Sequence, residues 1–161
     1  MRALGRKASL VTIDLNNPHA ATAERGFSDL IAGDAAFLDV IQPAGDSGLH
    51  RIAAGRIEAD VLFDEPDTLS LTFEAMAEAY GWVVCRLHAA PGAVDLLELT
   101  AGYMDTVIIA SNAAAEDPAL ADLYAIAEDA GAGQILVAQD RAAEHVAQSG
   151  STDPELRLRA A

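Results

Sequence analysis

The sequence predicts a doubly wound α/β domain, in which a mostly parallel sheet of about five strands carries helices on both faces. Two observations lead to this fold class. Short apolar runs alternate with longer helical stretches, and four of the five runs are apolar at almost every position. Strands that are covered on both faces show such continuous apolar runs. The expected strands are residues 9–14, 49–53, 82–87, 106–111 and 134–139.

Helical stretches separate the expected strands, as parallel connections require. Asp67 or Thr68 can cap one helix, and Asp117 stands before a proline at the first position of another. Gly131 and Gly133 follow that second helix and end it before the last strand. The expected helices are residues 27–32, 35–41, 68–79, 93–101 and 118–130.

The length of 161 residues fits one domain, which we expect to span residues 1–147. Residues 148–161 are rich in Gly, Ser, Thr, Asp and Pro before a short Leu-Arg repeat, and we expect them to form a flexible tail. Residues 2–8 look like the last turn of a helix that enters the first strand. Either the natural domain has lost what preceded this turn, or the sequence begins inside a domain.

The excess of acidic over basic residues restricts the partners of this chain. The formal net charge is −15, and the isoelectric point lies near 4.3. An acidic surface repels nucleic acid and anionic membranes, so we expect no nucleic-acid partner. No apolar run approaches the roughly 20 residues of a membrane span, so direct insertion of this chain into a membrane is not expected. Cys85 is the only cysteine, which fits a reducing, cytoplasmic setting.

Several segments of the sequence resemble one family of ATPases. Residues 2–18 look like a helix end followed by a strand that terminates in an acidic loop. The segments GFSDLIAG at 26–33, FLDVI at 37–41 and GLHRIAAGR at 48–56 follow it. This arrangement resembles the MinD/ParA-like P-loop ATPases, and most of all the cytoplasmic ATPase domain of bacterial tyrosine kinases and polysaccharide co-polymerases. The resemblance covers roughly residues 2–140.

The resemblance implies a P-loop NTPase-like fold and a role in the biosynthesis or export of exopolysaccharide or capsule. It also implies a protein partner, such as the membrane-bound polysaccharide-export machinery. The implied location is the cytoplasm, either alone or as the soluble domain of a membrane-anchored protein. A homo-oligomer is compatible with it, because P-loop relatives often pair face to face around nucleotide.

The phosphate-binding loop of that family, the Walker A loop, is missing from the sequence. No G-x-x-x-x-G-K-[ST] pattern occurs, although this loop supplies the N–H groups, the lysine and the hydroxyl that hold phosphates and Mg²⁺. The Walker-B aspartate of the family would follow the apolar run 83–85, where Arg86 stands. Arginine inverts the charge that a magnesium site needs. We therefore expect no cofactor, and ATP with Mg²⁺ only if a Walker A loop lies upstream.

Five residues are candidates for a nucleotide- or ligand-binding site, and none is expected to be catalytic. Asp14 ends the first expected strand, at the sheet edge where open α/β sheets bind ligands, and it is the one candidate metal ligand. Asn16 and Asn17 stand where the family usually has aspartate and arginine. Arg86 and His88 lie at the same edge and could bind an anion. Two other interpretations stay open, in which Asp14 caps its loop and Arg86 pairs with an acid.

The sequence therefore favours a degenerate, non-catalytic P-loop ATPase-like domain with a regulatory or protein-interaction role. The first alternative is an active ATPase or protein-tyrosine kinase whose Walker A loop lies upstream of residue 1. The second is a receiver-like signalling module. A receiver needs an acidic pair after its first strand and a phosphorylatable aspartate after its third, whereas this sequence offers Asp14 alone and then Arg86, Leu87 and His88.

Overall fold

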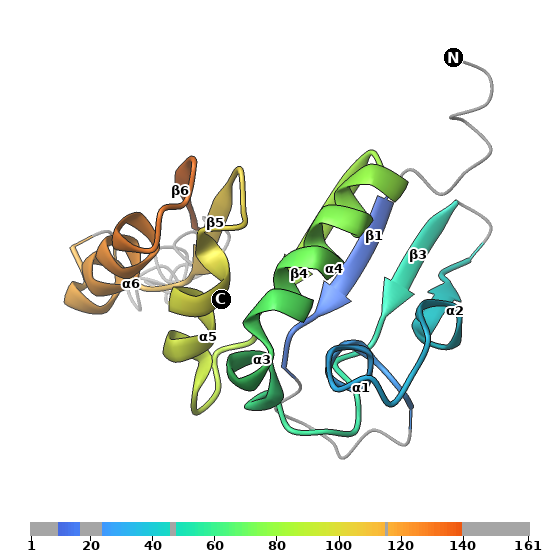
Figure 1. The fold of residues 1–161 in the computed structure, drawn as a ribbon. Helices are drawn as coiled ribbons and strands as arrows, with labels where there is room; N and C mark the ends of the chain where they lie inside the picture. The colour runs from blue at the N-terminus through green and yellow to red at the C-terminus, as the bar shows by residue number, and fades with distance from the viewer. Residues whose placement is uncertain (1–9, 17–23, 46–47, 115, 140–161) are drawn as a thin grey trace, which may run out of the picture.

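The computed structural model describes residues 10–16, 24–45, 48–114 and 116–139, and shows strands alternating with helices (Figure 1). The strands are β1 (Leu10–Asp14), β2 (Ile41–Pro43), β3 (Leu49–Ile52), β4 (Trp82–Arg86), β5 (Val107–Ser111) and β6 (Ile135–Gln139). The helices are α1 (Phe27–Ile31), α2 (Phe37–Val40), α3 (Val61–Asp64), α4 (Pro66–Ala79), α5 (Ala93–Ala101) and α6 (Pro118–Asp129). None of these helices combines the length and the apolar character that a membrane span needs.

The strands form a mostly parallel arrangement, which confirms the predicted α/β fold class. One sheet has the strand order β2-β3-β1-β4, in which β1 pairs in parallel with β3 and with β4. The edge strand β2 pairs with β3 in the antiparallel sense. β5 and β6 form a second, parallel pair. The expected single sheet is thus divided into two, because β4 and β5 are not hydrogen-bonded to one another.

Each of the five expected strands is present to within one residue at either end, but two short elements were not predicted. Residue 41 was assigned to a helix, whereas the helix ends at Val40 and Ile41 begins β2. Pro43 lacks a backbone N–H group, and an edge strand such as β2 tolerates this. α3 is a single turn, too short to show a helical period in the sequence. The predicted tail, residues 148–161, and the N-terminal segment lie outside the described residues.

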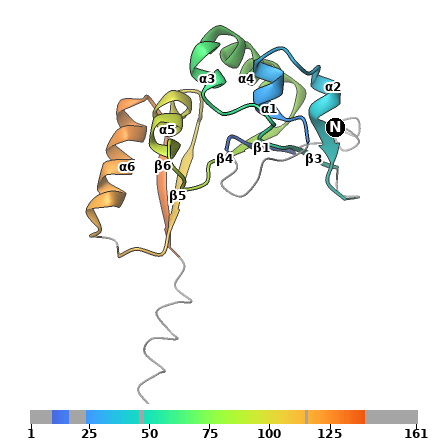
Figure 2. The same ribbon diagram turned by 90° about the horizontal axis from the view of Figure 1, so that it is seen from below.

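The apolar core lies between the sheet and helices packed on one of its faces. Figure 2 shows α1, α3 and α4 on the same side of β1, β3 and β4. Val11 and Ile13 of β1 and Ile52 of β3 are fully buried against these helices. The rings of Phe27 on α1 and Phe73 on α4 lie 5.6 Å apart between their centroids. Burial of each such side chain contributes about 1.5–3 kcal/mol, so this face supplies the main folding energy.

The opposite face of the same sheet is open in the part of the chain that the structure describes, where the sequence predicted helices on both faces. In β4, Trp82 is 74% exposed and Val84 is 42% exposed, while Val83 and Cys85 pack against the core. Leu10 and Thr12 of β1 are the register partners of Trp82 and Val84, and they share this face with them. Successive strand residues point to opposite faces, which explains the alternation. The second sheet also exposes apolar side chains, among them Ile108, Leu136 and Val137.

Candidate functional site

A group of three charged side chains lies at the carboxyl end of the open face. Asp14 ends β1, directly opposite Arg86 of β4, and Arg51 of β3 stands opposite Thr12. Residues two apart in a strand share a face, so the register brings the two arginines to the same carboxylate from both neighbouring strands. Nε and Nη2 of Arg86 both lie 2.6 Å from Oδ1 of Asp14. Nη2 of Arg51 lies 3.2 Å from Oδ2, and its Nε lies 3.4 Å from the same oxygen.

The burial of these side chains differs sharply. The carboxylate of Asp14 is 7% exposed, whereas the side chains of Arg51 and Arg86 are 42% and 49% exposed. Two guanidinium groups facing one carboxylate leave a local charge of +1 in a chain whose net charge is −15. Both oxygens of Asp14 are engaged by cations, so a metal ion at this carboxylate would have to compete with two positive charges. Arg86 does pair with an acid, as one interpretation of the sequence held.

The next candidate, Asn16, bonds to the backbone of the segment that follows β4. Its Nδ2 donates to the carbonyl oxygen of His88 at 2.9 Å, and its Oδ1 accepts from the N–H of His88 at 2.8 Å. The N–H of Leu15 donates to the carbonyl oxygen of Arg86 at 2.9 Å. Asn16 therefore extends the β1–β4 ladder by one side-chain pair, which fixes the strand ends that hold Asp14 and Arg86.

The structure brings together Asp14, Asn16, Arg86 and the backbone of His88, while the imidazole of His88 is exposed to solvent. Asn17 lies outside the described residues. Arg51 belongs to this group but was missed in the sequence. The signal that could have found it is its place in a neighbouring strand, opposite Thr12 and two residues before the end of β1. The register between two strands cannot be derived from either strand alone.

Cys85 lies next to Arg86 in sequence but on the covered face of β4. Burial raises the pKa of its thiol to about 12, because the low-polarity surroundings disfavour the thiolate. The protonated thiol therefore predominates at neutral pH, which disfavours a role as nucleophile. In the described part of the chain there is also no group of three or more His, Cys, Asp or Glu side chains that could hold a metal ion.

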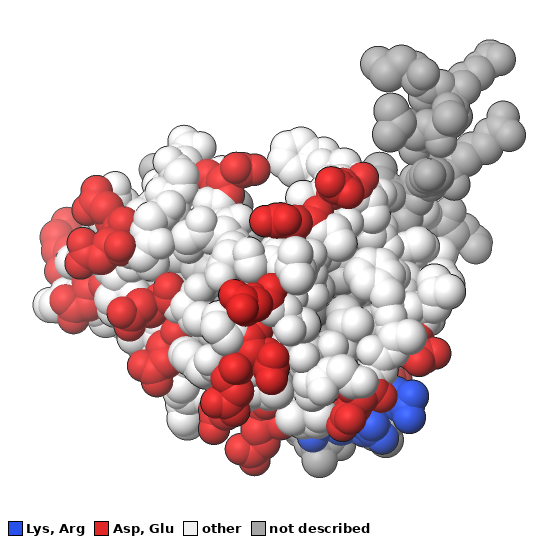
Figure 3. Space-filling view, in the orientation of Figure 1, with Lys and Arg blue, Asp and Glu red and all other residues white. Residues whose placement is uncertain are grey.

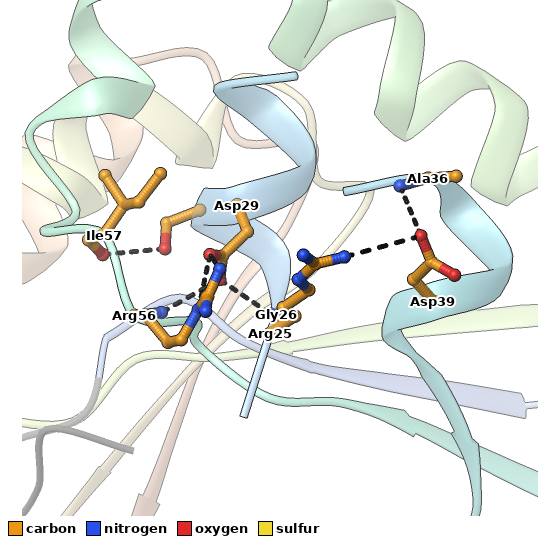
Figure 4. A network of polar contacts seen from close by, with 8 residues as sticks. Arg25, Gly26, Asp29, Ala36, Asp39, Arg56 and Ile57 are labelled. Carbon is orange, nitrogen blue, oxygen red and sulfur yellow. Dashed lines mark hydrogen bonds and ion pairs between the residues drawn. The ribbon is translucent and has the colours of Figure 1, made fainter. Parts of the chain in front are cut away.

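A second polar network, shown in Figure 4, surrounds the carboxylate of Asp29 on α1. Asp29 is fully buried, and its Oδ2 accepts from the backbone N–H groups of Gly26 and Arg56, both at 2.9 Å. Its Oδ1 lies 3.0 Å from both Nε and Nη2 of Arg56. The two backbones approach closely here, since a Cβ at Gly26 would overlap the carbonyl oxygen of Ala53. Asp29 thus joins the start of α1 to the loop that follows β3.

Two opposing effects set the pKa of Asp29. Burial alone raises this pKa, because it disfavours the charged carboxylate. The backbone N–H groups of Arg56 and Gly26 and the guanidinium of Arg56 stabilise the carboxylate by more, so its pKa lies below the ordinary value of 3.8. Asp29 is therefore ionised at neutral pH.

The described Lys and Arg side chains are few, and each one faces an aspartate. Arg25 lies 3.9 Å from Asp39, and the other three hold Asp14 and Asp29. Figure 3 shows the acidic side chains spread over the molecule and the basic ones gathered at one lower corner. Arg51 lies near the end of β3 and Arg86 ends β4, while Arg56 follows β3 and Arg25 precedes α1. The positive charge of the described chain is thus concentrated near the carboxyl edge of that sheet.

Solved structures of ATPase and kinase domains are similar to this chain. The kinase domain of VpsO matches it with a TM-score of 0.62 at 17% sequence identity, over 86% of this chain and 74% of that chain. The kinase domain of the Escherichia coli tyrosine kinase ETK matches with a TM-score of 0.62 at 17% identity, over 81% and 55%. Apo McdA from Cyanothece matches with a TM-score of 0.59 at 14% identity, over 86% and 63%.

These similarities establish the fold, which is that of tyrosine kinase domains and of a ParA/MinD-like ATPase, consistent with a P-loop NTPase-like architecture. The chain spans about three quarters of the VpsO domain and just over half of the ETK domain. No protein family model matches the sequence, and no curated protein matches it either.

Proposed function

We propose that this chain is a degenerate P-loop ATPase-like domain without catalytic activity, which acts through protein contacts in the biosynthesis or export of exopolysaccharide or capsule. The observation that carries this proposal is the group formed by Asp14, Arg51 and Arg86. The carboxylate that would stand nearest a metal ion is engaged by two guanidinium groups, one of them at 2.6 Å.

Phosphoryl transfer depends almost entirely on positioning and on charge stabilisation by Mg²⁺ and basic groups around the phosphates. A magnesium ion prefers carboxylate and water oxygens in octahedral geometry. Arg86 stands where the resemblance would place such a carboxylate, and it neutralises Asp14 instead. Restoring a magnesium site would therefore require removal of two ion pairs as well as a new acidic ligand. Because both changes would be needed, we infer that phosphoryl transfer has been lost rather than merely weakened.

The process and the location follow from the resemblance to tyrosine kinase and polysaccharide co-polymerase domains. We infer a cytoplasmic domain, either free or attached to a membrane-anchored protein, whose partner belongs to the polysaccharide-export machinery. The low-identity similarity to the kinase domains of VpsO and ETK supports the fold on which this inference rests. Without nucleotide chemistry, contacts with other proteins are the activity that the domain can still perform, and we therefore infer a regulatory role.

Isothermal titration calorimetry with ATP and Mg²⁺ tests the loss of activity directly. We expect no saturable heat up to about 1 mM ATP, which is the upper end of ordinary substrate affinities. Autophosphorylation and ATP hydrolysis measured in parallel are expected to stay at the level of the buffer. The kinase domain of ETK serves as the positive control under identical conditions. Saturable binding of MgATP by this chain would overturn the proposal.

A second candidate is an active ATPase or tyrosine kinase whose phosphate loop precedes residue 1. One observation favours it, since the chain spans only 55% of the ETK kinase domain. The gene sequence immediately upstream decides whether a G-K-[ST] pattern exists. If it does, the longer protein goes through the same calorimetry, and an Arg86→Asp variant shows whether the arginine blocks metal binding.

A further inference from the structure

The open face of the sheet has an apolar part and a basic end. Trp82 and Val84 project from β4, with Leu10 and Thr12 beside them on β1. Arg86 follows on the same face, two residues after Val84. Among the described residues no helix packs on this side, whereas α1, α3 and α4 cover the other (Figure 2). Parallel sheets are almost always covered on both faces, so an uncovered apolar face of this kind indicates a layer supplied by something else.

A helix fits this layer better than a strand does. An added strand would pair with the backbone edge of β4 and leave the projecting side chains of Trp82 and Val84 exposed to water. A helix packed across the sheet covers those side chains, as α4 covers Val83 and Cys85 on the opposite face. The exposed atoms belong to side chains of the face, so a helix is the element that buries them.

The charge at the end of the face specifies the chemistry of that helix. The contacts of Arg51 and Arg86 with Asp14 use Nε and Nη2 of each guanidinium. A guanidinium has five N–H donors, so donors remain on both for a second carboxylate. The local charge of +1 attracts that carboxylate although the chain as a whole is acidic.

We propose that this face docks an apolar helix of a partner protein, one acidic side chain of which binds Arg51 and Arg86. The inference rests on the proposed function and deepens it by naming the chemistry of the partner. Strand residues rise about 3.3 Å each, so Trp82 and Arg86 lie about 13 Å apart along β4. A helix covers that distance in about nine residues. The C-terminal end of the partner helix faces the two arginines, because that end carries partial negative charge and is attracted to them, and the acidic side chain lies in the same part of the helix.

The experiment uses the fluorescence of Trp82, the only tryptophan of the chain and a residue of the open face. The probe is a synthetic amphipathic peptide with leucines at helical spacing and a glutamate about nine residues after the first leucine. A matched peptide carries lysine in place of that glutamate. We expect the glutamate peptide to shift the Trp82 emission to shorter wavelength in a saturable way, and to gain helicity on binding. The lysine peptide is expected to bind at least about tenfold more weakly, because like charges then meet at the arginines.

Two variants locate the binding. Val84→Asp places a charge in the middle of the open face and is expected to abolish the shift. Leu71→Asp changes a side chain of α4 that is more exposed than Val84 but lies outside this face, and this variant is expected to bind the peptide as the wild type does. Circular dichroism checks that both variants stay folded.

Several outcomes would overturn the inference. No shift up to about 1 mM of the glutamate peptide, in the range of weak specific binding, would exclude helix docking. Equal binding of both peptides would remove the role of the arginines. A blue-shifted emission without peptide would mean that the face is already covered, by a second copy if the shift depends on concentration and by the chain itself if it does not. None of these readouts involves nucleotide, so they fail independently of the proposed loss of ATP binding.

Discussion

The two faces of the four-stranded sheet use the same strands but differ in chemistry. On the covered side, Val83 and Cys85 of β4 pack against the core, and the buried acid Asp29 of α1 is held by two backbone N–H groups together with the guanidinium of Arg56. On the open face, Trp82 and Val84 remain exposed, and Asp14 is held by side-chain guanidinium groups alone among the contacts described. The covered face is therefore committed to the fold. The open face keeps contacts that can be exchanged for those of a partner.

The strongest test of this contrast is removal of Asp29. Asp29→Ala leaves two buried backbone N–H groups and the guanidinium of Arg56 without their acceptor, so we expect a loss of about 3–5 kcal/mol in the free energy of unfolding. Chemical denaturation measures it. Asp39→Ala is the control, because the carboxylate of Asp39 is half exposed. It accepts a hydrogen bond from the N–H of Ala36 and lies 3.9 Å from Arg25, so we expect its loss to cost about 1 kcal/mol. An equal loss of unfolding free energy in the two variants would show that the buried contacts of Asp29 stabilise the fold no more than the exposed contacts of Asp39 do.

The second test compares thiols on the two faces of β4. Cys85 has a raised pKa and a partly buried side chain that packs against the core, so iodoacetamide is expected to modify it slowly at pH 8. The thiol introduced by Val84→Cys in a Cys85→Ser background lies on the open face, and we expect it to react at least about 100-fold faster. Mass spectrometry follows both reactions. Similar rates would mean that the open face is covered in solution, which would contradict the proposed docking surface.

The third test removes Asp14. Asp14→Asn leaves two guanidinium groups close together, but both are about half exposed and water can solvate them. We therefore expect a loss of only about 1–2 kcal/mol in the free energy of unfolding, less than for Asp29. The same denaturation experiment measures it, with added salt expected to recover part of the loss by screening the two arginines. A cost above that of Asp29→Ala would make the Asp14 group the main polar anchor of the fold.

Much of the fold was predictable from the sequence, because β1, β4, β5 and β6 each coincide with a short apolar run that is separated from the next by a helical stretch or a loop. The open face was not predictable for the same reason. Val83, Val84 and Cys85 are all apolar, and such a run indicates cover on both sides whether or not the second layer belongs to the same chain. The one division of the sheet, between β4 and β5, has no local signal in the sequence either.

The candidate site was predictable where it depends on strand ends and not where it depends on register. Asp14 and Arg86 were identified because each ends an apolar run, and Arg51 was missed because its pairing with Asp14 is set by the alignment of β3 on β1. Asp29 was missed as well. Its burial depends on the loop around residue 56 folding over α1, a long-range contact that no local pattern records.

The smallest expected effect is the pH dependence of the stability that Asp29 contributes. It shows whether burial or hydrogen bonding dominates the pKa of this carboxylate. Burial raises its pKa and the N–H and guanidinium donors lower it, and the donors prevail in the structure. A pKa below the unfolded value contributes stability that is present above that value and is lost as the pH falls through the folded pKa. The advantage of the wild type over Asp29→Asn in unfolding free energy is thus expected to be constant at neutral pH and to shrink as the pH falls below 3.8.

Denaturation curves of the wild type and Asp29→Asn, measured from pH 7 down to the acid limit of the fold, provide this difference. Every other acid is common to both proteins, so their titrations cancel in the difference when they are far from residue 29. If the gap widened on acidification, the folded pKa would lie above the unfolded one, and burial would outweigh the hydrogen bonds. Asp29 would then be a destabilised carboxylate on the covered side of the sheet, retained for the contacts it makes between α1 and the loop after β3.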